Sequence, residues 1–376
     1  MLRYMTAGES HGKGLLAIIE GIPAGLKLSE ADIDPDLKKR MKGYGRGGRM
    51  SIEADAAEII SGCRKGKTIG SPVGILIRNK DHKIDILPDI FNPRPGHADL
   101  AGMMKYAFKD ARDVLERASA RETASRVAAG AVAKVFLREF DITVLSHVLS
   151  VGKVTASSGD LSFNEIKKKV SSYGKLNCAD PKAEKMMCLE IDQASLKGDT
   201  LGGSFEVLAD KVPPGLGSYV QWDRRIDFSL AGAVMSIPAV KAVSIGRGIE
   251  ASFLPGSLVH DEIKYDKNKR SFSRVTNNAG GIEGGVTNGE TLIVRGFMKP
   301  IATLSSPLGT VNMKTKKMIG ASVERADVCA VGACAVVAEA VTALEIASAF
   351  MKKFGCDSIS EIKRNYKGYL KSLKDM

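Results

Sequence analysis

The sequence predicts a mixed α and β protein that folds as a single domain over residues 1–376. Short apolar runs typical of strands, such as "GLLAIIE" near the N-terminus, recur along the chain. Two long Ala/Val-rich segments, near 124–140 and 331–354, have the length and composition of helices. No segment has the composition of a linker, so nothing in the pattern divides the chain.

The composition is that of a globular protein with a strong basic excess. The 376 residues are 44% hydrophobic and 26% charged, and 55 basic against 43 acidic residues give a formal charge of +12. This charge favours polyanionic partners, but it does not separate nucleic acids from phosphorylated metabolites. Aromatic residues make up only 6% of the chain, whereas proteins that bind single strands stack bases on several of them.

The expected location is the cytoplasm, without a membrane span. Glu9, His11 and Lys13 stand where a secretory signal would need an apolar run. No apolar run approaches the ~20 residues of a spanning helix. The six cysteines contain no C-x-x-C pair and no histidine-spaced metal set, so we expect reduced thiols and no metal.

Glycine and proline mark the ends of the elements in the N-terminal half. The run 14–20 predicts a strand, and residues 66–82 predict a hairpin that turns at Gly70–Ser71–Pro72. Residues 51–62 fit a helix or a strand equally well. Residues 99–116 predict a helix, and Ser119-x-x-Glu122 has the pattern of a capping box at the start of the next one.

The C-terminal half alternates helices and strands. A helix stopped by Pro238 and followed by a strand is expected, and the glycine-dense loop 277–290 leads into the strand "TLIVRGFM". The second long apolar helix should end at Gly355, as helices commonly do. A basic amphipathic segment, 359–374, closes the chain.

Several short stretches resemble known motifs but fail on spacing. "SGCRKGKT" has three residues between Gly62 and Gly66 where a phosphate-binding P-loop needs four, and "GESHGKG" fails in the same way. "GDTLGG" resembles a serine-protease loop without a matching triad. None of these stretches supports a nucleotide hydrolase or a protease.

Two of the five histidines are candidates for acid–base chemistry. His11 in "GESHG" and His97 in "RPGHAD" lie in glycine-containing loops beside polar or basic residues, and imidazole exchanges protons near neutral pH. His147 lies in an alternating apolar run and is expected to be a core or edge residue, while His82 and His260 fit polar turns.

The arginines near these loops predict a shared anion-binding pocket. Guanidinium groups bind carboxylates and phosphates through paired hydrogen bonds, and a helix start attracts the same anions. Each arginine alone would most often be a solvated surface charge. Three separate Arg-bearing segments, one of them with the loop histidine His97, favour the pocket: Arg40, Arg46 and Arg49; Arg94; Arg117 and Arg121.

Three further segments are weaker candidates. Arg325 and Asp327 precede the last long helix, where the carboxylate could cap the helix, orient a ligand nitrogen or accept a proton. The loop "AGGIEGGVTNGE" and the turn "KPIAT" are glycine- and proline-marked turns that carry little information alone.

In this order, the segments resemble the chorismate synthase family nearly from end to end. The matching stretches are "GESHG", "GYGRGGRM", "RPGHAD", "RASARETASRVAAGAVAK", "DRRIDFSLAGAVMSIPAVKAVSIG", "AGGIEGGVTNGE", "KPIAT" and "ERADVCAVGA". The resemblance implies a lyase reaction in which 5-enolpyruvylshikimate 3-phosphate loses its 3-phosphate and a C6 hydrogen to give chorismate. This 1,4-anti elimination requires reduced FMN (FMNH2) without net redox change, and it serves aromatic amino acid biosynthesis in the shikimate pathway.

The same resemblance implies roles for particular residues. His11 would protonate the departing phosphate, His97 would lie near the flavin ring, and Asp327 would help to remove the C6 proton. The substrate would be bound by Ser10, Arg40, Arg46, Arg49, Arg94, Ser119 and Arg121. The flavin would contact Arg117, Ala118, Ser119, Pro238, Ala239, Gly284, Lys299, Pro300, Ile301, Ala302, Thr303 and Arg325.

The implied fold is an α+β β-α-β sandwich with central antiparallel sheets and outer helices, assembled as a homotetramer. An external flavin reductant is the expected partner, because no nicotinamide fingerprint is visible, although some family members reduce flavin with NADPH themselves. Two rival functions remain open at this stage. One is RNA binding through the Gly/Arg segment, residues 40–50 ("RMKGYGRGGRM"), which the single occurrence of that element does not favour. The other is an FMN reductase.

Overall fold

The computed structural model describes residues 2–47, 53–157, 161–171, 174–324 and 327–376. Its helices are α1 Asp34–Met41, α2 Asp99–Tyr106, α3 Arg112–Ala118, α4 Thr123–Arg138, α5 Phe163–Val170, α6 Pro181–Leu196, α7 Ile226–Met235, α8 Val331–Phe354 and α9 Ile359–Leu373. The strands are β1 Arg3–Ala7, β2 Gly14–Glu20, β3 Glu58–Ser61, β4 Cys63–Arg64, β5 Lys67–Thr68, β6 Val73–Arg78, β7 Thr143–Val151, β8 Val154–Thr155, β9 Gly203–Asp210, β10 Val240–Ile245, β11 Ile263–Asp266, β12 Ser271–Arg274, β13 Ile282–Glu283, β14 Val286–Thr287, β15 Leu292–Met298, β16 Gly309–Val311 and β17 Met318–Gly320.

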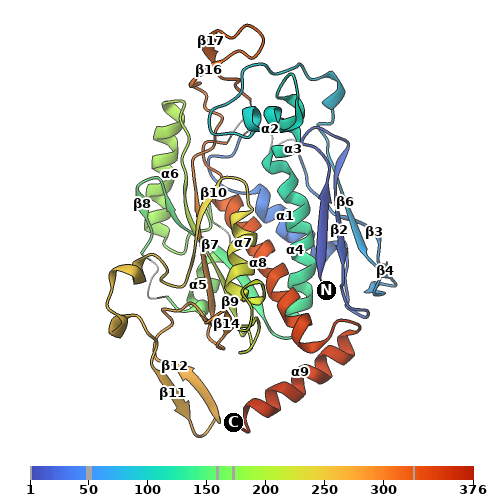
Figure 1. The fold of residues 1–376 in the computed structure, drawn as a ribbon, viewed down its shortest axis with the longest axis vertical. Helices are drawn as coiled ribbons and strands as arrows, with labels where there is room; N and C mark the ends of the chain where they lie inside the picture. The colour runs from blue at the N-terminus through green and yellow to red at the C-terminus, as the bar shows by residue number, and fades with distance from the viewer. Residues whose placement is uncertain (1, 48–52, 158–160, 172–173, 325–326) are drawn as a thin grey trace.

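Two antiparallel sheets enclose a layer of helices (Figure 1). The first sheet has the strand order β1-β2-β6-β3, and the second has the order β10-β15-β9-β7-β8. Helix α4 packs against β2 and β6 of the first sheet, while α8 packs against β7 and β9 of the second. The fold is therefore an α+β sandwich of β-α-β layers.

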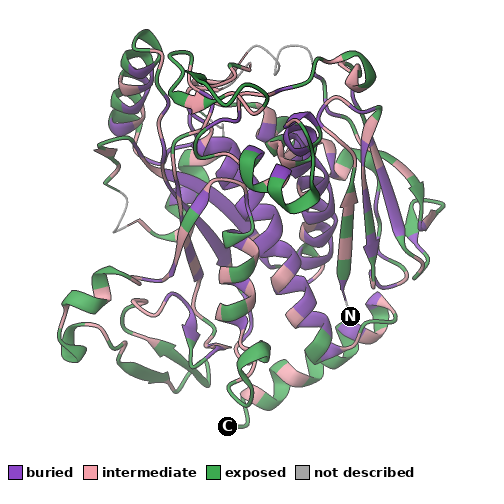
Figure 2. Cartoon of the chain, turned by 45° about the horizontal axis from the view of Figure 1, so that its top comes forward, coloured by how far each residue is buried: buried purple, intermediate pink, exposed green. Residues whose placement is uncertain are grey.

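The order of these layers differs from the expected one. Central sheets with outer helices were expected, whereas α4 and α8 lie in the middle and the sheets lie outside (Figures 1 and 2). The reason is composition: these helices are apolar around most of their circumference, and such a helix must be covered on every side. Almost every residue of α8 is buried, Glu339 included.

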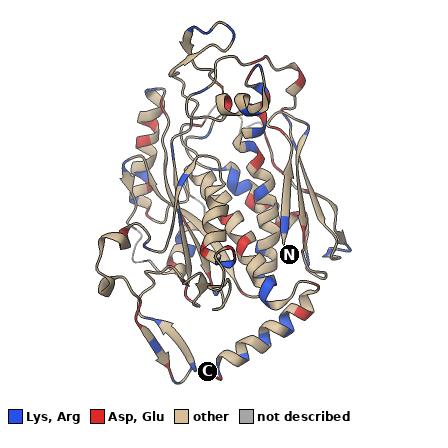
Figure 3. Cartoon of the chain, viewed as in Figure 1, with Lys and Arg blue, Asp and Glu red and all other residues tan. Residues whose placement is uncertain are grey.

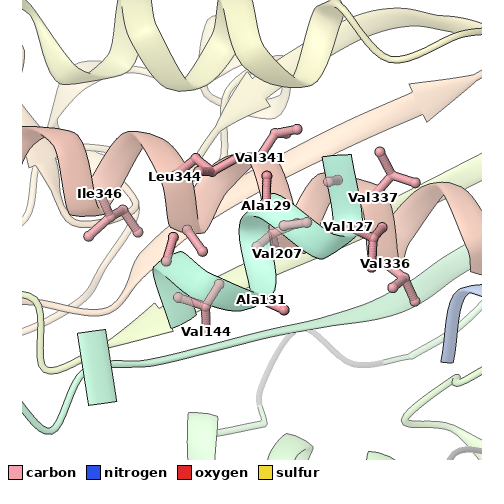
Figure 4. Close-up of a cluster of buried hydrophobic side chains, with 14 of the residues drawn as sticks. Val127, Ala129, Ala131, Val144, Val207, Val336, Val337, Val341, Leu344 and Ile346 are labelled. Atoms are coloured by element: carbon pink, nitrogen blue, oxygen red, sulfur yellow. The ribbon is translucent and has the colours of Figure 1, made fainter. Parts of the chain in front are cut away.

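Helices α4 and α8 approach each other closely because small side chains face the contact. A Cβ atom added to Gly130 would lie 2.4 Å from Cβ of Ala340 and 2.5 Å from its Cα. Around this contact, valine, leucine and isoleucine side chains from both helices and from β7 and β9 fill the space (Figure 4). One cluster of buried apolar side chains includes residues of both sheets, so the two sheets share one core.

Helix α8 is the one described helix that is long and apolar enough to cross a membrane. Of its most apolar 18-residue window, 83% is buried against the rest of the protein. Its length and composition are thus accounted for by its place in the middle layer.

The sheets follow the expected period of two. In β2, Leu15, Ala17 and Ile19 point into the core and are at most 1% exposed, while Ile18 on the other face is 42% exposed. Residues 51–62, for which the sequence did not decide between helix and strand, contain the short strand β3, which pairs with β6.

The hairpin expected over residues 66–82 is wrong. Strand β5 pairs with β4, whereas β6 pairs with β2 and β3. The tight turn lies at Lys65 and Gly66, whose φ angles of 51° and 71° are those of a two-residue hairpin turn. The Gly70–Ser71–Pro72 stretch instead connects β5, in the two-stranded β4-β5 sheet, to β6 in the four-stranded first sheet.

Two helix boundaries also differ from expectation. The predicted helix over 99–116 is two helices, because Ala107 adopts a left-handed φ of 56° and ends α2. Ser119 caps a short 3-10 turn, Ala120–Glu122, by accepting a hydrogen bond from the Arg121 amide. The Glu122 carboxylate pairs with Arg126 at 2.8 Å, so the two residues form no capping box.

The other predicted elements are confirmed. Helix α7 ends shortly before Pro238 and is followed by β10, and α8 ends at Gly355. His147 is fully buried on β7, where its Nε2 lies 3.2 Å from the Glu206 carboxylate of β9.

Candidate active site

A cavity of about 770 Å³ lies where the loop ends of the first sheet meet the starts of α4 and α8 and the end of α7. It contains most of the residues that the sequence singles out. The predicted site residues in its lining are Ser10, His11, Arg40, Arg46, Arg94, His97, Ala118, Ser119, Arg121, Pro238, Ala239, Lys299, Ile301, Ala302, Thr303 and Asp327.

The lining is predominantly cationic. Its described residues include seven lysines and arginines but only three acids, although acids elsewhere on the chain are numerous (Figure 3). Lys83 pairs with Asp81 at 3.1 Å. Lys241 and Lys299 form no ion pair within the described residues, so both charges remain available to an anion in the cavity.

His11 lies in the loop between β1 and β2 and is held by Glu116 of α3. Its Nδ1 lies 3.0 and 3.1 Å from the two carboxylate oxygens, and its backbone N–H donates to Oε2 at 2.8 Å. The other ring nitrogen, Nε2, lies 4.0 Å from Oδ2 of Asp81, which also lines the cavity. The ring can therefore act on a cavity ligand through Nε2 while Nδ1 stays bound to Glu116.

His97 is held in a similar way by Asp99 at the start of α2. The distance from Nδ1 to Oδ1 of Asp99 is 2.5 Å, and Asp99 is fully buried. Arg94 also approaches Nδ1, at 3.1 Å, but a guanidinium has only donors. Since Nδ1 donates its proton to the carboxylate, this approach is a contact and not a hydrogen bond.

Arg94 completes this cluster from the cavity wall. It donates to Asp99 from Nε at 2.8 Å and to the Thr303 hydroxyl from Nη1 at 2.8 Å. Burial alone would raise the pKa of Asp99, but the hydrogen bonds from His97 and Arg94 outweigh it and lower that pKa well below its usual range. Asp99 is therefore a fixed negative charge behind His97.

Two further arginines are buried around one acid. Arg121 donates to both oxygens of Asp55 at 2.6 and 2.8 Å, and Arg40 approaches the same carboxylate at 3.5 Å. Arg121 also donates to the side-chain amide oxygen of Asn79, Oδ1, at 2.7 Å. Burial lowers the pKa of Arg40 to about 10, although Asp55 opposes this shift, so an anion in the cavity would relieve a real desolvation cost.

Arg46 connects the Gly/Arg segment to the start of α8. Its Nη1 lies 2.8 Å from Oδ2 of Asp327, and the amide of Gly47 donates to Oδ1 at 2.6 Å. Asp327 thus holds Arg46 and Gly47 in place, and Arg46 itself lies in the cavity lining.

Another part of the lining combines apolar side chains with backbone. Ile237, Ala239, Val240 and Ile301 supply apolar surface, and the amide of Lys299 donates to the Ala239 carbonyl at 2.9 Å. Ala239 has a φ of 70°, which is uncommon for a residue with a Cβ. This turn directs the chain from α7 into β10 along the cavity.

Some predicted residues are not in the described lining. Arg117 donates to the carbonyls of Gly8 and Thr6 at 2.9 and 3.1 Å, Gly284 lies in the turn between β13 and β14, and Pro300 is exposed. Arg49 and Arg325 lie outside the described residues.

Sequence reasoning missed the residues that hold the predicted ones. Asp99 stands two positions after His97 and could have been found by that spacing. Glu116, Asp55 and Asn79 are distant in sequence from their partners, and no local pattern marks them. The missed cavity-lining residues with charges are Asp81, Lys83, Lys241 and Glu324.

The arrangement is suited to proton transfer beside a multiply charged anion. Two histidines, each bound through Nδ1 to a buried carboxylate, reach the same cavity as the paired arginines. Among the described residues, no group of three or more His, Cys, Asp or Glu side chains could hold a metal ion.

Comparison with known proteins agrees with this arrangement. A family model described as chorismate synthase matches residues 2–351. The chain is 53% identical to the chorismate synthase of Geobacter metallireducens and 52% identical to that of Thermoanaerobacter pseudethanolicus, with 100% of both chains covered in each case. A solved structure titled as a crystal structure of chorismate synthase matches with a TM-score of 0.83 and 42% identity, over 100% of this chain and 99% of that one. The chain therefore belongs to the chorismate synthase family of lyases.

Proposed function

We propose that the described cavity converts 5-enolpyruvylshikimate 3-phosphate to chorismate and inorganic phosphate. The observation that carries this proposal is the pairing of two oriented histidines with several arginines around one space. The substrate has one phosphate and two carboxylates, and a cationic pocket is the environment that such an anion needs. The volume of about 770 Å³ is within the range of sites for small molecules and cofactors.

The residues present also fit FMN beside the substrate. Ile237, Ala239, Val240 and Ile301 form an apolar wall of the kind that a flavin ring needs, and Lys299 and Lys241 could hold the flavin phosphate. Gly96 opposes Lys299, and a Cβ added there would lie 3.6 Å from the Lys299 amine. Burial, with Lys241 second, lowers the pKa of Lys299, as expected of a lysine that waits for an anion.

The chemistry that bound reduced FMN would supply is transient electron density for the breaking carbon–oxygen bond. The protein supplies the protons and the charges. His11 gives the Nε2 proton to the departing phosphate, and Asp327 helps to accept the C6 proton. His97, fixed by Asp99, would lie near the flavin ring and help to set the charge of the reduced flavin.

The arginines stabilise the substrate charges. Arg40, Arg46 and Arg121 line the cavity together with Ser10 and Ser119. Arg94 contributes in part by fixing Asp99 and Thr303, which already occupy three of its nitrogens. Arg49, Arg117, Gly284, Pro300 and Arg325 remain proposals that rest on the family resemblance.

The wider setting is also a proposal. The family resemblance supports a homotetramer, an external flavin reductant and a cytoplasmic location. A single domain over residues 1–376 is supported by the core that both sheets share. Binding of nucleic acid is disfavoured, because Arg40 and Arg46 are turned into the cavity wall.

An anaerobic assay tests the function. Purified protein is mixed with dithionite-reduced FMN and 5-enolpyruvylshikimate 3-phosphate, and chorismate absorbance and inorganic phosphate are followed together, with oxidised FMN as the control. We expect equal amounts of both products with reduced flavin only. Folded protein that binds flavin but forms neither product would contradict the proposal. If that protein also oxidised NADPH with FMN alone, the reductase would be favoured.

A further inference from the structure

Glu116 binds both the ring and the backbone of His11. The two carboxylate oxygens of Glu116 lie 3.0 and 3.1 Å from Nδ1 of the His11 ring, and Oε2 also accepts the backbone N–H of His11 at 2.8 Å. The Glu116 carbonyl also accepts the amide of Ser10 at 2.9 Å. These bonds fix the position of the loop and the direction of the ring together.

Glu116 itself is held as a buried anion. Its side chain is 0% exposed, and Arg112, one turn earlier on α3, donates to Oε1 at 3.3 Å. Arg112 also donates to Glu324 of the cavity lining at 3.3 Å, so it is fixed at both ends. Burial alone would raise the pKa of Glu116, but the bonds from His11 and Arg112 outweigh it and lower that pKa.

We propose that Glu116 is the positioning residue for the proton donor His11. An ionised carboxylate has no proton to donate and can only accept hydrogen bonds. Glu116 therefore keeps the proton of His11 on Nδ1, and Nε2 faces the cavity and Asp81. An imidazole fixed in this way presents Nε2, and no other atom, to a bound phosphate. This inference rests on the proposed function for the role of His11, but not for the geometry.

The proton balance follows from this geometry. In the protonated ring both nitrogens carry a proton. The Nε2–H bond breaks as the O–H bond forms on the departing phosphate, and the ring becomes neutral with its proton on Nδ1. Glu116 accepts a hydrogen bond from Nδ1 before and after the transfer, and no proton moves to it.

The chain offers a matched control for Glu116. Glu206 is also buried, also binds a histidine, His147, at 3.2 Å, and also binds an arginine, Arg295, at 2.7 Å. None of these three residues lines the cavity as described. Loss of a buried carboxylate that pairs with histidine and arginine can therefore be separated from loss of the group behind His11.

The first test is kinetic. Glu116→Gln should lower kcat for chorismate formation roughly 10- to 100-fold, part of the 10²–10⁴ that a general acid supplies, with KM nearly unchanged. In a His11→Ala background the same change should have less than about a twofold effect, because residues that act as a unit are not additive. Glu206→Gln should keep kcat within about twofold of the unchanged protein.

A second test needs no turnover. In ¹⁵N-histidine-labelled protein, with His11 assigned through His11→Gln, neutral His11 should carry its proton on Nδ1, and Glu116→Gln should introduce the Nε2–H form. An Nε2–H form in the unchanged protein, or an unchanged kcat in Glu116→Gln, would overturn the inference. If no chorismate forms at all, the proposed function fails, while the tautomer still decides whether Glu116 orients His11.

Discussion

Arg46 forms a 2.8 Å ion pair with Asp327, which joins the Gly/Arg segment to the residues just before α8. Both side chains are only partly exposed, at 11% and 20%. The pair brings together a residue proposed to bind substrate and a residue proposed to move a proton. Arg46 of the Gly/Arg segment is therefore part of the cavity wall.

A double-mutant cycle tests this pair. Arg46→Met should raise KM for the substrate about 10- to 100-fold, the range expected for one lost bond to a charged group. Asp327→Asn should lower kcat. Because the two side chains touch, the free-energy change calculated from kcat/KM for the double variant should differ from the sum of the two single changes by about 1–3 kcal/mol. Arg46→Met combined with Asp266→Asn, on the distant β11–β12 hairpin, should be additive, and additivity of the first pair would contradict the coupling.

Lys299 should determine flavin affinity. Lys299→Met removes one of two cations that lack an ion pair in the described cavity lining, so the Kd of oxidised FMN should rise about 10-fold or more. Fluorescence quenching of FMN during titration measures this. Lys264→Met on the β11 strand, which is also a lysine-to-methionine change, should leave the Kd within twofold. Equal affinity for all three proteins would remove Lys299 from the phosphate site.

The close contact between α4 and α8 predicts a pair of opposite effects on stability. Gly130→Ala places a Cβ within 2.6 Å of three Ala340 atoms, two of them backbone, and should lower the free energy of unfolding by about 1–3 kcal/mol. Gly232→Ala in α7 meets nothing within 4 Å and should raise it by about 0.5–1 kcal/mol. Urea unfolding measures both, and equal effects would contradict the close packing of α4 on α8.

Lys134 links three helices through a buried ion pair. Its amine lies 2.8 Å from Asp36 of α1 and also binds Glu339 of α8, which accepts a further bond from Ser146 at 2.9 Å. Lys134→Met should cost about 3–5 kcal/mol at neutral pH, because two acids lose their counter-charge. Urea unfolding against pH measures this loss.

The pH dependence of that loss has a definite sign. Burial alone would lower the pKa of Lys134, but Glu339 and Asp36 outweigh it and raise that pKa above its ordinary 10.5. A lysine whose pKa is raised by folding contributes its full stabilisation at every pH below the pKa of the unfolded state. That contribution is lost only as the pH rises through the pKa of the folded state. The gap between the two proteins should therefore stay constant from pH 7 to 9.5, and a gap that closes there would contradict the ion pair.

Local pattern predicted the elements that depend on near neighbours. The strand around Leu15 and the helices that end before Pro238 and at Gly355 follow from periodicity and from the residues that stop them. The hairpin failed because strand pairing is decided across the chain. Gly62 packs against Val73, where a Cβ would lie 2.6 Å from its Cα, and no signal within 66–82 contains that contact.

Residue type and order along the chain predicted the candidate site residues, but they did not predict the buried acids that hold those residues in place. His11 and His97 could be chosen from glycine loops, and most of the residues that the family resemblance implied line the cavity. The buried acids Glu116 and Asp55 could not be chosen, because an acid in a helix or a loop is most often solvated. Only the fold shows that each faces a cation or a histidine from a distant segment.

The most direct test of the account is a crystal structure of the protein with oxidised FMN and 5-enolpyruvylshikimate 3-phosphate. We predict that both ligands lie together in the cavity of about 770 Å³. The substrate phosphate should be within hydrogen-bonding distance of Nε2 of His11, and the flavin ring should pack on Ile237 and Val240. Either ligand bound outside this cavity, or a phosphate remote from His11, would contradict the assignment.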